Sequence, residues 1–348
     1  MKKRILIISR NGKPMPPRTQ MILDVLQERY EVDLVDVKPV NDWKRRINYL
    51  TFYYFDLVNI KRLKSRIKDY DAVMIKDLQF LPLAKEAKKQ EKFVVYETLD
   101  FNPQLRYYGL CAQFPVLKNF PQIQKKAEQA ELKLVRKYVD RLLVNSDALN
   151  EHFGGKAIVN YYSSPFEGQG IRNKAELKPA LLYLGHFSEE KGALDMLQIS
   201  SELDWPLFIY GGVAETQLQN IIKANEKAIQ YDRMPADALT KELKDLMQRY
   251  FLFGFSLIRD ANASYAVQNA NKDIDYLAMG IPLIGNRRKT TGALIEAGCG
   301  IYGENAAELK EISDEQKKAW KNRCLEVYNK RFANAQFRKN LLTAFNDL

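Results

Sequence analysis

Short runs of Val, Ile and Leu recur along the chain with amphipathic stretches between them, and this alternation constrains the fold more than any other feature. Such runs are typical of strands in a parallel sheet that helices cover on both faces. The sequence therefore predicts an α/β protein with two Rossmann-like domains facing each other across a cleft. The runs are residues 4–9, 31–36, 71–75, 93–97, 141–145 and 157–160, and then 180–185, 206–211, 228–232, 252–258 and 281–285.

The length of 348 residues also suits two domains. The polar segment 163–179, which contains both Pro and Gly, predicts a linker between the two series of strands. We therefore expect a first domain over 1–165 and a second over 178–332. The spacing Ser313-x-x-Gln316 predicts the start of a helix, and a further helix at about 333–348 could pack back on the first domain.

Cysteine and histidine usage excludes several classes of protein. The three cysteines lie far apart without C-x-x-C spacing, and there are only two histidines. This excludes a disulfide framework and a Cys/His zinc site. The first apolar run is too short for a signal peptide, and no stretch reaches the ~18 apolar residues of a membrane span. We therefore expect a cytoplasmic protein.

The net charge of +11 lies entirely in the first half of the chain. Lys and Arg outnumber Asp and Glu by 30 to 19 in residues 1–165, whereas residues 166–348 hold 24 of each. The densest part is residues 41–70, where eight basic residues stand against three acidic ones among several aromatic residues. An anionic membrane surface is one partner that this suits, and a solvated helix face is the alternative. No nucleic-acid-binding motif accompanies the charge.

Two motifs in the second half follow predicted strands, where doubly wound sheets bind ligands. In the first, Gly185, His186 and Lys191 lie between a strand and a helix. Glycine allows close backbone approach, the helix start offers free N–H groups and the lysine adds charge, which together suit a diphosphate. A strand-to-helix turn with an exposed lysine is the alternative.

The second motif covers residues 269–285. If 270–279 is helical, Lys272 shares a helix face with Asp275 and Tyr276. The lysine could then meet a phosphate while Asp275 accepts hydrogen bonds from a ribose. The alternative is a surface ion pair between Lys272 and Asp275, worth ~0.2–0.5 kcal/mol.

The two motifs, G-H-F-S-E-E-K-G at 185–192 and N-x-x-K-x-x-D-Y-x-A-x-G-x-P at 269–282, resemble the donor half of GT-B glycosyltransferases. The likeness is to the large retaining family with many bacterial capsule, lipopolysaccharide and exopolysaccharide enzymes. It implies that Lys191 and Lys272 contact the donor diphosphate, that Asp275 contacts the ribose, and that Gly185 approaches the sugar phosphate. His186 and Tyr276 are included in this expected donor site.

Two positions depart from the family pattern. His186 stands where the family usually has Arg, and Val267 stands where many members carry a first glutamate. We interpret Lys272 as a partial functional replacement for that glutamate. Loss of activity is the other explanation.

In the first domain, candidate acceptor residues follow the first and fourth predicted strands. The loop 11–18 contains Gly12 and Arg18, and Glu97 and Asp100 come at the end of the fourth run. Either carboxylate could position or deprotonate a sugar hydroxyl. Capping of the following segment is an equal alternative.

The resemblance implies a glycosyltransferase that moves a sugar from a nucleotide-diphospho-sugar to a saccharide. The basic first domain suggests a lipid-linked acceptor at the inner membrane face, in surface polysaccharide biosynthesis. We expect Lys272, Asp100 and Glu97 to be catalytic, and no cofactor or metal, because lysines and helix N-termini can offset the diphosphate charge. A nucleotide-sugar epimerase of the same architecture and a non-catalytic nucleotide-sugar-binding protein are the alternatives.

Overall fold

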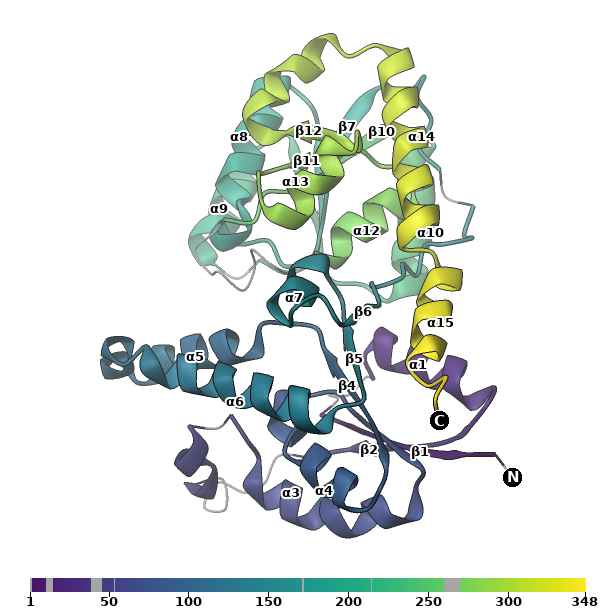
Figure 1. Ribbon diagram of the computed structural model, residues 1–348. Helices are drawn as coiled ribbons and strands as arrows, with labels where there is room; N and C mark the ends of the chain where they lie inside the picture. Colours follow the sequence, from purple (N-terminus) through teal and green to yellow (C-terminus); the bar gives the residue numbers. More distant parts are fainter. Residues whose placement is uncertain are drawn as a thin grey trace. The chain divides into compact units, whose positions relative to one another are not determined.

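The computed structural model describes residues 2–10, 15–38, 46–52, 54–170, 172–213, 215–259 and 270–348. It divides into two compact units (Figure 1). The first unit comprises Met1–Tyr161 together with Phe337–Leu348, and the second comprises Tyr162–Gln336. Each unit contains one six-stranded sheet whose paired strands all run parallel, which confirms the predicted fold class.

The sheet of the first unit has the order β2-β1-β3-β4-β5-β6. Its strands coincide with the six apolar runs expected in this half of the chain. They are β1 (Arg4–Ser9), β2 (Glu31–Asp36), β3 (Ala72–Ile75), β4 (Phe93–Thr98), β5 (Arg141–Val144) and β6 (Ile158–Val159). The α-helices are α1 (Pro17–Gln27), α3 (Leu57–Leu63), α4 (Leu83–Lys89), α5 (Asn102–Gln113), α6 (Gln122–Tyr138) and α7 (Asp147–His152), and the 3₁₀ turns are η1 (Arg46–Thr51), η2 (Lys64–Asp69), η3 (Leu78–Phe80) and η4 (Pro115–Asn119).

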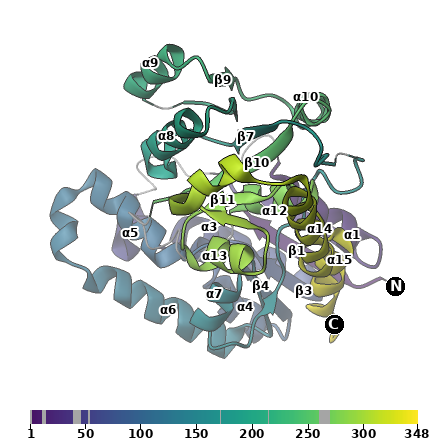
Figure 2. The same cartoon turned by 90° about the horizontal axis from the view of Figure 1, so that it is seen from above.

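Helices cover both faces of this sheet because successive strand side chains point to opposite sides. On one face, Ile5 and Ile7 of β1 pack in a core with α1 and with Phe337 and Leu341 of α15 (Asn334–Thr343). On the other face, α4 contacts β3 and β4, and Tyr96 donates a hydrogen bond to α6. Helices α5 and α6 lie side by side (Figures 1 and 2).

The sheet of the second unit has the order β12-β11-β10-β7-β8-β9. Five of its strands match the expected runs, and the sixth, β12, was not predicted. The strands are β7 (Pro179–Leu184), β8 (Leu207–Tyr210), β9 (Ala228–Tyr231), β10 (Phe251–Ser256), β11 (Leu283–Gly285) and β12 (Gly300–Tyr302). The helices are α8 (Ala193–Leu203), α9 (Thr216–Ala224), α10 (Ala236–Met247), α12 (Asn271–Ala278), α13 (Lys289–Glu296) and α14 (Asp314–Arg331), with the 3₁₀ turns η5 (Glu189–Lys191) and η6 (Gly303–Glu311).

The core of the second unit also has two sides. Leu181 and Tyr183 of β7 pack with α8, α9 and η6, while α12 packs against β10 and against α14, beside which it lies (Figure 2). Helix α14 begins where the capping spacing predicts it, because the Ser313 hydroxyl accepts a hydrogen bond from the Gln316 amide at 3.2 Å. Within the described ranges, no helix is both long and apolar enough to cross a membrane.

Candidate functional site

The turn after β7 brings backbone and charge to the carboxyl end of the second sheet. Gly185 and His186 are exposed in this turn, and η5 with Lys191 follows directly. Gly192, before α8, has a φ of +83°, and a Cβ there would lie 2.4 Å from the carbonyl oxygen of Leu257. The turn therefore requires glycine at this position.

Three cationic side chains gather at this edge: Lys191, Lys272 and Arg288. Lys272 lies at the start of α12, with its Nζ 4.2 Å from the ring centre of Tyr183. Burial lowers the pKa of Lys272 to about 7; the Asp273 carboxylate opposes this shift, and the positive charges of Lys191 and Arg288 add to it. Burial likewise lowers the pKa of Lys191, with Glu190 opposing and Arg288 adding to the shift. The three charges are thus close enough to repel one another.

Among the described residues, Asp273 is the buried carboxylate that lies against Arg288 of this cluster. Asp273 is 2% exposed, and its Oδ2 lies 3.5 Å from the Arg288 guanidinium and accepts a hydrogen bond from Thr291 at 2.7 Å. Its Oδ1 is buried with no hydrogen-bond partner. The cluster therefore has more cations than carboxylates, and it lies at the end of β7 and the start of α12. A bound anionic group such as a diphosphate would stabilise it.

The structure brings Lys191 and Lys272 together, as the two motifs predicted. Arg288 was missed by the sequence reasoning. The available signal was its position, because Arg287 and Arg288 closely follow the predicted strand that ends at Gly285. The same rule that drew attention to Gly185 and Lys191 would have found it.

Asp275 has different neighbours from Lys272. Its Oδ1 accepts a hydrogen bond from the Ser164 hydroxyl at 2.7 Å, and the Tyr162 side chain also bonds to it. Burial raises the pKa of Asp275 to about 7, although both hydrogen bonds oppose the shift. In the structure this carboxyl holds the segment 162–164 to α12, and its contact with a ribose stays a prediction.

Tyr276 lies in the core. It is 0% exposed, and its hydroxyl accepts a hydrogen bond from the Leu184 amide at 2.9 Å while lying 3.3 Å from the Leu182 carbonyl oxygen. The side chain therefore fixes α12 against β7, and its part in donor binding stays a prediction.

Glu97 and Arg18 belong to a buried ion cluster in the first unit. Glu97 is 0% exposed, lies 2.8 Å from the Arg18 guanidinium and 3.4 Å from the Lys76 ammonium. Arg18 also donates to the carbonyl oxygens of Asn160 and Tyr161. Burial alone would raise the pKa of Glu97, but the charges of Arg18 and Lys76 outweigh it and the pKa is lowered. A carboxylate held in this way is a weak proton acceptor.

A second group of charges at this edge was not predicted. Arg10 and Asp77 directly follow β1 and β3, and the Arg10 amide donates to Asp77 at 2.9 Å. Burial raises the pKa of Asp77, and Arg106, Lys76 and Arg10 oppose the shift. The Arg10 guanidinium also lies 2.5 Å from the buried Asp56. Both groups of charges, that of Glu97 and that of Arg10, lie at the carboxyl ends of strands, where open α/β sheets bind ligands.

The remaining expected residues have less defined surroundings. Asp100 is half-buried, and its backbone carbonyl accepts hydrogen bonds from Thr98 and Asn102. Gly12 and Val267 lie outside the described residues. In the basic segment 41–70, Lys61, Arg62, Lys64 and Arg66 are all exposed, whereas Leu63 and Ile67 between them are buried; residues 41–45 lie outside the described ranges.

Three solved structures are similar to the whole chain at low sequence identity. Anabaena Alr3699/HepE, solved in complex with UDP-glucose, is 14% identical with a TM-score of 0.63, over 99% of this chain and 100% of that one. AviGT4, a glycosyltransferase involved in avilamycin A biosynthesis, is 11% identical with a TM-score of 0.55, over 99% and 98%. A Listeria monocytogenes protein assigned as a UDP-N-acetylglucosamine 2-epimerase is 12% identical with a TM-score of 0.58, over 100% and 96%.

No protein-family model matches the sequence, and a search of curated proteins finds no significant match. Identities this low carry information about the fold alone. Each of the two Rossmann-like units has a six-stranded parallel sheet. Together with the similarity to these solved structures, this assigns the chain to the GT-B fold.

Proposed function

We propose that this protein is a glycosyltransferase that uses a nucleotide-diphospho-sugar as donor. The observation that carries the proposal is the cluster of Lys191, Lys272 and Arg288 at the carboxyl end of the second sheet. Structures of the same fold give support, since HepE was solved with UDP-glucose and AviGT4 is described as a glycosyltransferase.

In this proposal the three cations stabilise the negative charge that develops on the leaving diphosphate. Fixed charges placed before the reaction stabilise a developing anion without having to reorganise. Lys272 becomes fully protonated when the diphosphate binds, and Asp275 turns toward the ribose. Asp100 positions or deprotonates the acceptor hydroxyl, while Glu97 keeps Arg18 and Lys76 in place.

The finer features of the proposal concern stereochemistry, metal and acceptor. We propose a retaining transfer without metal, onto a lipid-linked saccharide in bacterial surface polysaccharide biosynthesis, with the protein peripheral on the inner membrane face. We propose retention of the configuration at the sugar's anomeric carbon because the two donor motifs resemble those of the retaining family. The excess of basic residues in the first half of the chain supports an anionic, membrane-bound acceptor.

Thermal unfolding with a panel of nucleoside diphosphates and their sugar conjugates tests the proposal. Without added metal, UDP, GDP or a sugar conjugate of either should stabilise the protein by ~2.7 kcal/mol at 100 times its dissociation constant. A shift seen only with Mg²⁺ or Mn²⁺ would contradict the metal-free site. No shift with any of these ligands would contradict the proposed function.

Nucleotide-sugar epimerisation is the second candidate, because the Listeria neighbour is assigned as a 2-epimerase. Product analysis separates the two reactions. A glycosyltransferase releases a nucleoside diphosphate and forms a glycosylated acceptor, whereas a 2-epimerase inverts C2 of the nucleotide sugar without needing an acceptor. A non-catalytic binding protein would show the thermal shift and neither product.

A further inference from the structure

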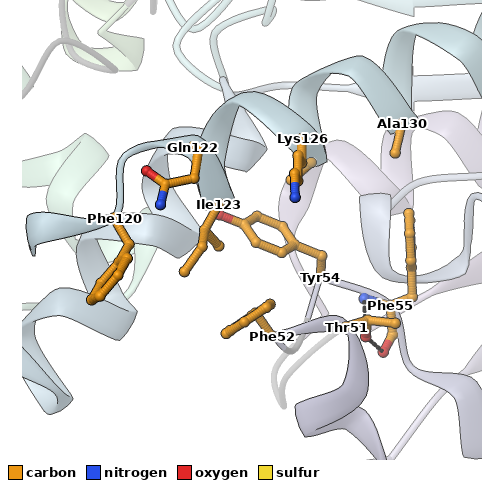
Figure 3. Close-up of a pocket in the computed structure, with 10 residues that line it drawn as sticks. Thr51, Phe52, Tyr54, Phe55, Phe120, Gln122, Ile123, Lys126 and Ala130 are labelled. Carbon is orange, nitrogen blue, oxygen red and sulfur yellow. Dashed lines mark hydrogen bonds between the residues drawn. The ribbon is translucent and has the colours of Figure 1, made fainter. Parts of the chain in front are cut away.

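An apolar pocket of about 440 Å³ lies in the first unit between α6 and the chain that follows η1 (Figure 3). Aromatic and aliphatic side chains form most of its wall, and Lys126 is the charged residue among them. It is lined by Thr51, Phe52, Tyr54 and Phe55 on one side and by Phe120, Gln122, Ile123, Lys126, Ala127 and Ala130 on the other. Neither the donor site nor the buried ion cluster of Glu97 uses any of these residues.

The walls of the pocket are held by internal hydrogen bonds. The Tyr54 hydroxyl donates to the Pro103 carbonyl oxygen of α5 at 3.0 Å, and the Thr51 hydroxyl bonds to the backbone of Phe55. Helix α6 is fixed to the sheet because Tyr96 donates to the buried Glu131 at 2.7 Å. The pocket is therefore formed before any ligand arrives, as is usual for binding sites.

Large apolar side chains remain exposed in the pocket wall and in the chain shortly before Phe120. Phe52 is 42% exposed and Phe120 is 43% exposed, and Phe114 and Val116, which flank the start of η4, are 41% and 63% exposed. Phe52 has a φ of +47°, a left-handed conformation that is uncommon for residues other than glycine. The Phe52 ring thus remains partly in contact with water, although burying it in the core would be more favourable for an isolated protein.

The exposed charge along the pocket walls is mainly positive, and Glu128, which follows Ala127 on α6, lies 3.7 Å from the His152 ring. Residues 101–127 contain no Asp or Glu, and their exposed cations are Lys118, Lys125 and Lys126. Asp56, the single acidic residue between 43 and 68, is buried and paired with Arg10. Whatever approaches this surface thus meets apolar side chains and positive charge together.

We propose that this pocket takes a hydrocarbon chain of an anionic bilayer lipid, with Lys126 facing the lipid head group. Exposed aromatic side chains flanked by lysines are typical of segments that rest in the membrane interface, and the positive rim complements an anionic leaflet. An acidic protein surface would satisfy the lysines but would leave the apolar pocket unfilled. The inference rests on the proposed function in that a lipid-linked acceptor brings the enzyme to a membrane.

Cosedimentation of the whole protein with vesicles tests the contact. Binding is expected to vesicles of phosphatidylglycerol and phosphatidylcholine in equal parts, and to be much weaker with phosphatidylcholine alone. Phe52→Ser and Phe120→Ser should each weaken partitioning about tenfold, because each removes a ring that is buried on binding. The control Ile221→Ser, which removes an exposed apolar side chain of the second unit, should bind like the wild type.

A tryptophan in place of Phe120 tests whether this side chain enters the bilayer when the protein binds vesicles. Compared with the wild type, which already contains Trp43, Trp205 and Trp320, Phe120→Trp should show an additional blue shift with anionic vesicles and additional quenching by lipids brominated on the acyl chain. Lys126→Gln should weaken binding to anionic vesicles more than Lys318→Gln, which removes an exposed charge of the second unit. Thermal unfolding of each variant confirms that it is folded.

Two results would overturn the inference. One is equal vesicle binding by the wild type and both Phe→Ser variants, which would reduce the contact to surface charge. The other is no vesicle binding by the folded wild type, which would leave the pocket to a protein partner. The donor thermal shift is measured on the same samples, so a failed membrane contact with an intact donor shift would leave the nucleotide-sugar function standing.

Discussion

At the residue scale, the pKa of Lys272 makes the charge of the proposed donor site depend on pH. Its pKa of about 7 means that the side chain is about half protonated near neutral pH when no anion is bound. A bound diphosphate favours the charged form and raises the pKa toward its usual range. Donor binding should therefore take up a proton above pH 7.

This coupling gives the first prediction. The donor dissociation constant is expected to rise between pH 7 and pH 9, by up to about tenfold per pH unit while Lys272 loses its proton. Lys272→Arg should flatten the profile because a guanidinium stays charged over this range. Calorimetric titration at several pH values measures both. A wild-type profile as flat as that of the variant would place the pH-sensitive group elsewhere.

The roles of Lys272 and Asp275 should separate in steady-state kinetics. Lys272→Ala should lower kcat by about 10²–10³, the usual effect of removing one preorganised electrostatic contact, with a smaller change in donor affinity. Asp275→Ala should chiefly raise the donor KM, because the ribose does not react. Ser164→Ala is the control, since it removes one of the two hydroxyls bonded to Asp275, a hydroxyl that also accepts from the Phe166 amide, and leaves the carboxyl in place. If Ser164→Ala has the same effect as Asp275→Ala, the Asp275 carboxyl acts by holding the segment 162–164 to α12 and does not contact the ribose.

The buried ion cluster of the first unit predicts a stability effect. Glu97→Gln leaves Arg18 and Lys76 without their carboxylate and should cost about 3–5 kcal/mol in the free energy of unfolding. Glu31→Gln, an exposed carboxylate paired with Arg4 at 3.7 Å, should change it by no more than ~0.5 kcal/mol. Urea unfolding measures both. If Glu97→Gln abolished transfer at unchanged stability, the residue would be catalytic after all.

The pH dependence of this stabilisation has a defined sign. The pKa of Glu97 is lowered in the folded protein, so its contribution is present above the unfolded value of about 4.5 and is lost as the pH falls through the folded value. Acid unfolding of the wild type should therefore become steeper below about pH 4.5, and that of Glu97→Gln should steepen less, because the lowered pKa of Asp56 still contributes.

At the scale of the elements, α3 and η2 present an amphipathic, basic face. Changing Lys61, Arg62, Lys64 and Arg66 to Gln should weaken binding to anionic vesicles by up to ~1 kcal/mol for each residue near the surface. The apolar residues on the opposite side are buried, so the fold and donor binding should not change. Vesicle sedimentation measures the effect, and equal binding by wild type and variant would make this a solvated face alone.

The sequence predicted the central strands well because parallel strands buried on both faces are continuous apolar runs, as in β1, β4, β7 and β10. It missed β12, whose residues Gly300–Tyr302 form a three-residue strand at the sheet edge. A strand so short has no period to detect. The helix period likewise placed Lys272 and Tyr276 on one face, but it could not tell that the first turn of α12 meets the cationic cluster while the next packs on β7.

The candidate sites were predicted only where a motif carried them. Lys191 and Lys272 lie in motifs, whereas Arg288 and Arg106 join their neighbours through tertiary contacts between segments distant in the chain. Spacing also cannot show that Glu97 is neutralised, because Arg18 and Lys76 come from other elements. The sequence alone therefore does not show which charged side chains from distant segments neutralise one another in the folded protein.

At the scale of the whole molecule, the chain passes between the two units twice, after Tyr161 and after Gln336. The second passage lets Phe337, Leu341 and Phe345 complete the core around β1 and α1. Each of these side chains is at most 2% exposed. The first unit therefore depends on a segment that lies far from the rest of it in sequence.

Phe345→Ala should test this dependence. Loss of a buried phenylalanine is expected to cost about 3–5 kcal/mol, and the control Thr343→Ala, at an exposed position of α15, no more than ~0.5 kcal/mol. Hydrogen exchange locates the effect: amides of β1 and α1 should lose protection while those of β7 and β10 keep theirs. Equal loss in both sheets would mean that the two units unfold as one.

The returning segment also sets an order of events on the ribosome. Residues 162–336 must emerge before 337–348 can close the core of the first unit. At about 5–20 residues per second, that delay is on the order of 10–35 s. The first unit is thus translated before the second but completes its core after it. During that interval the apolar surface of β1 and α1 is exposed and accessible to chaperones.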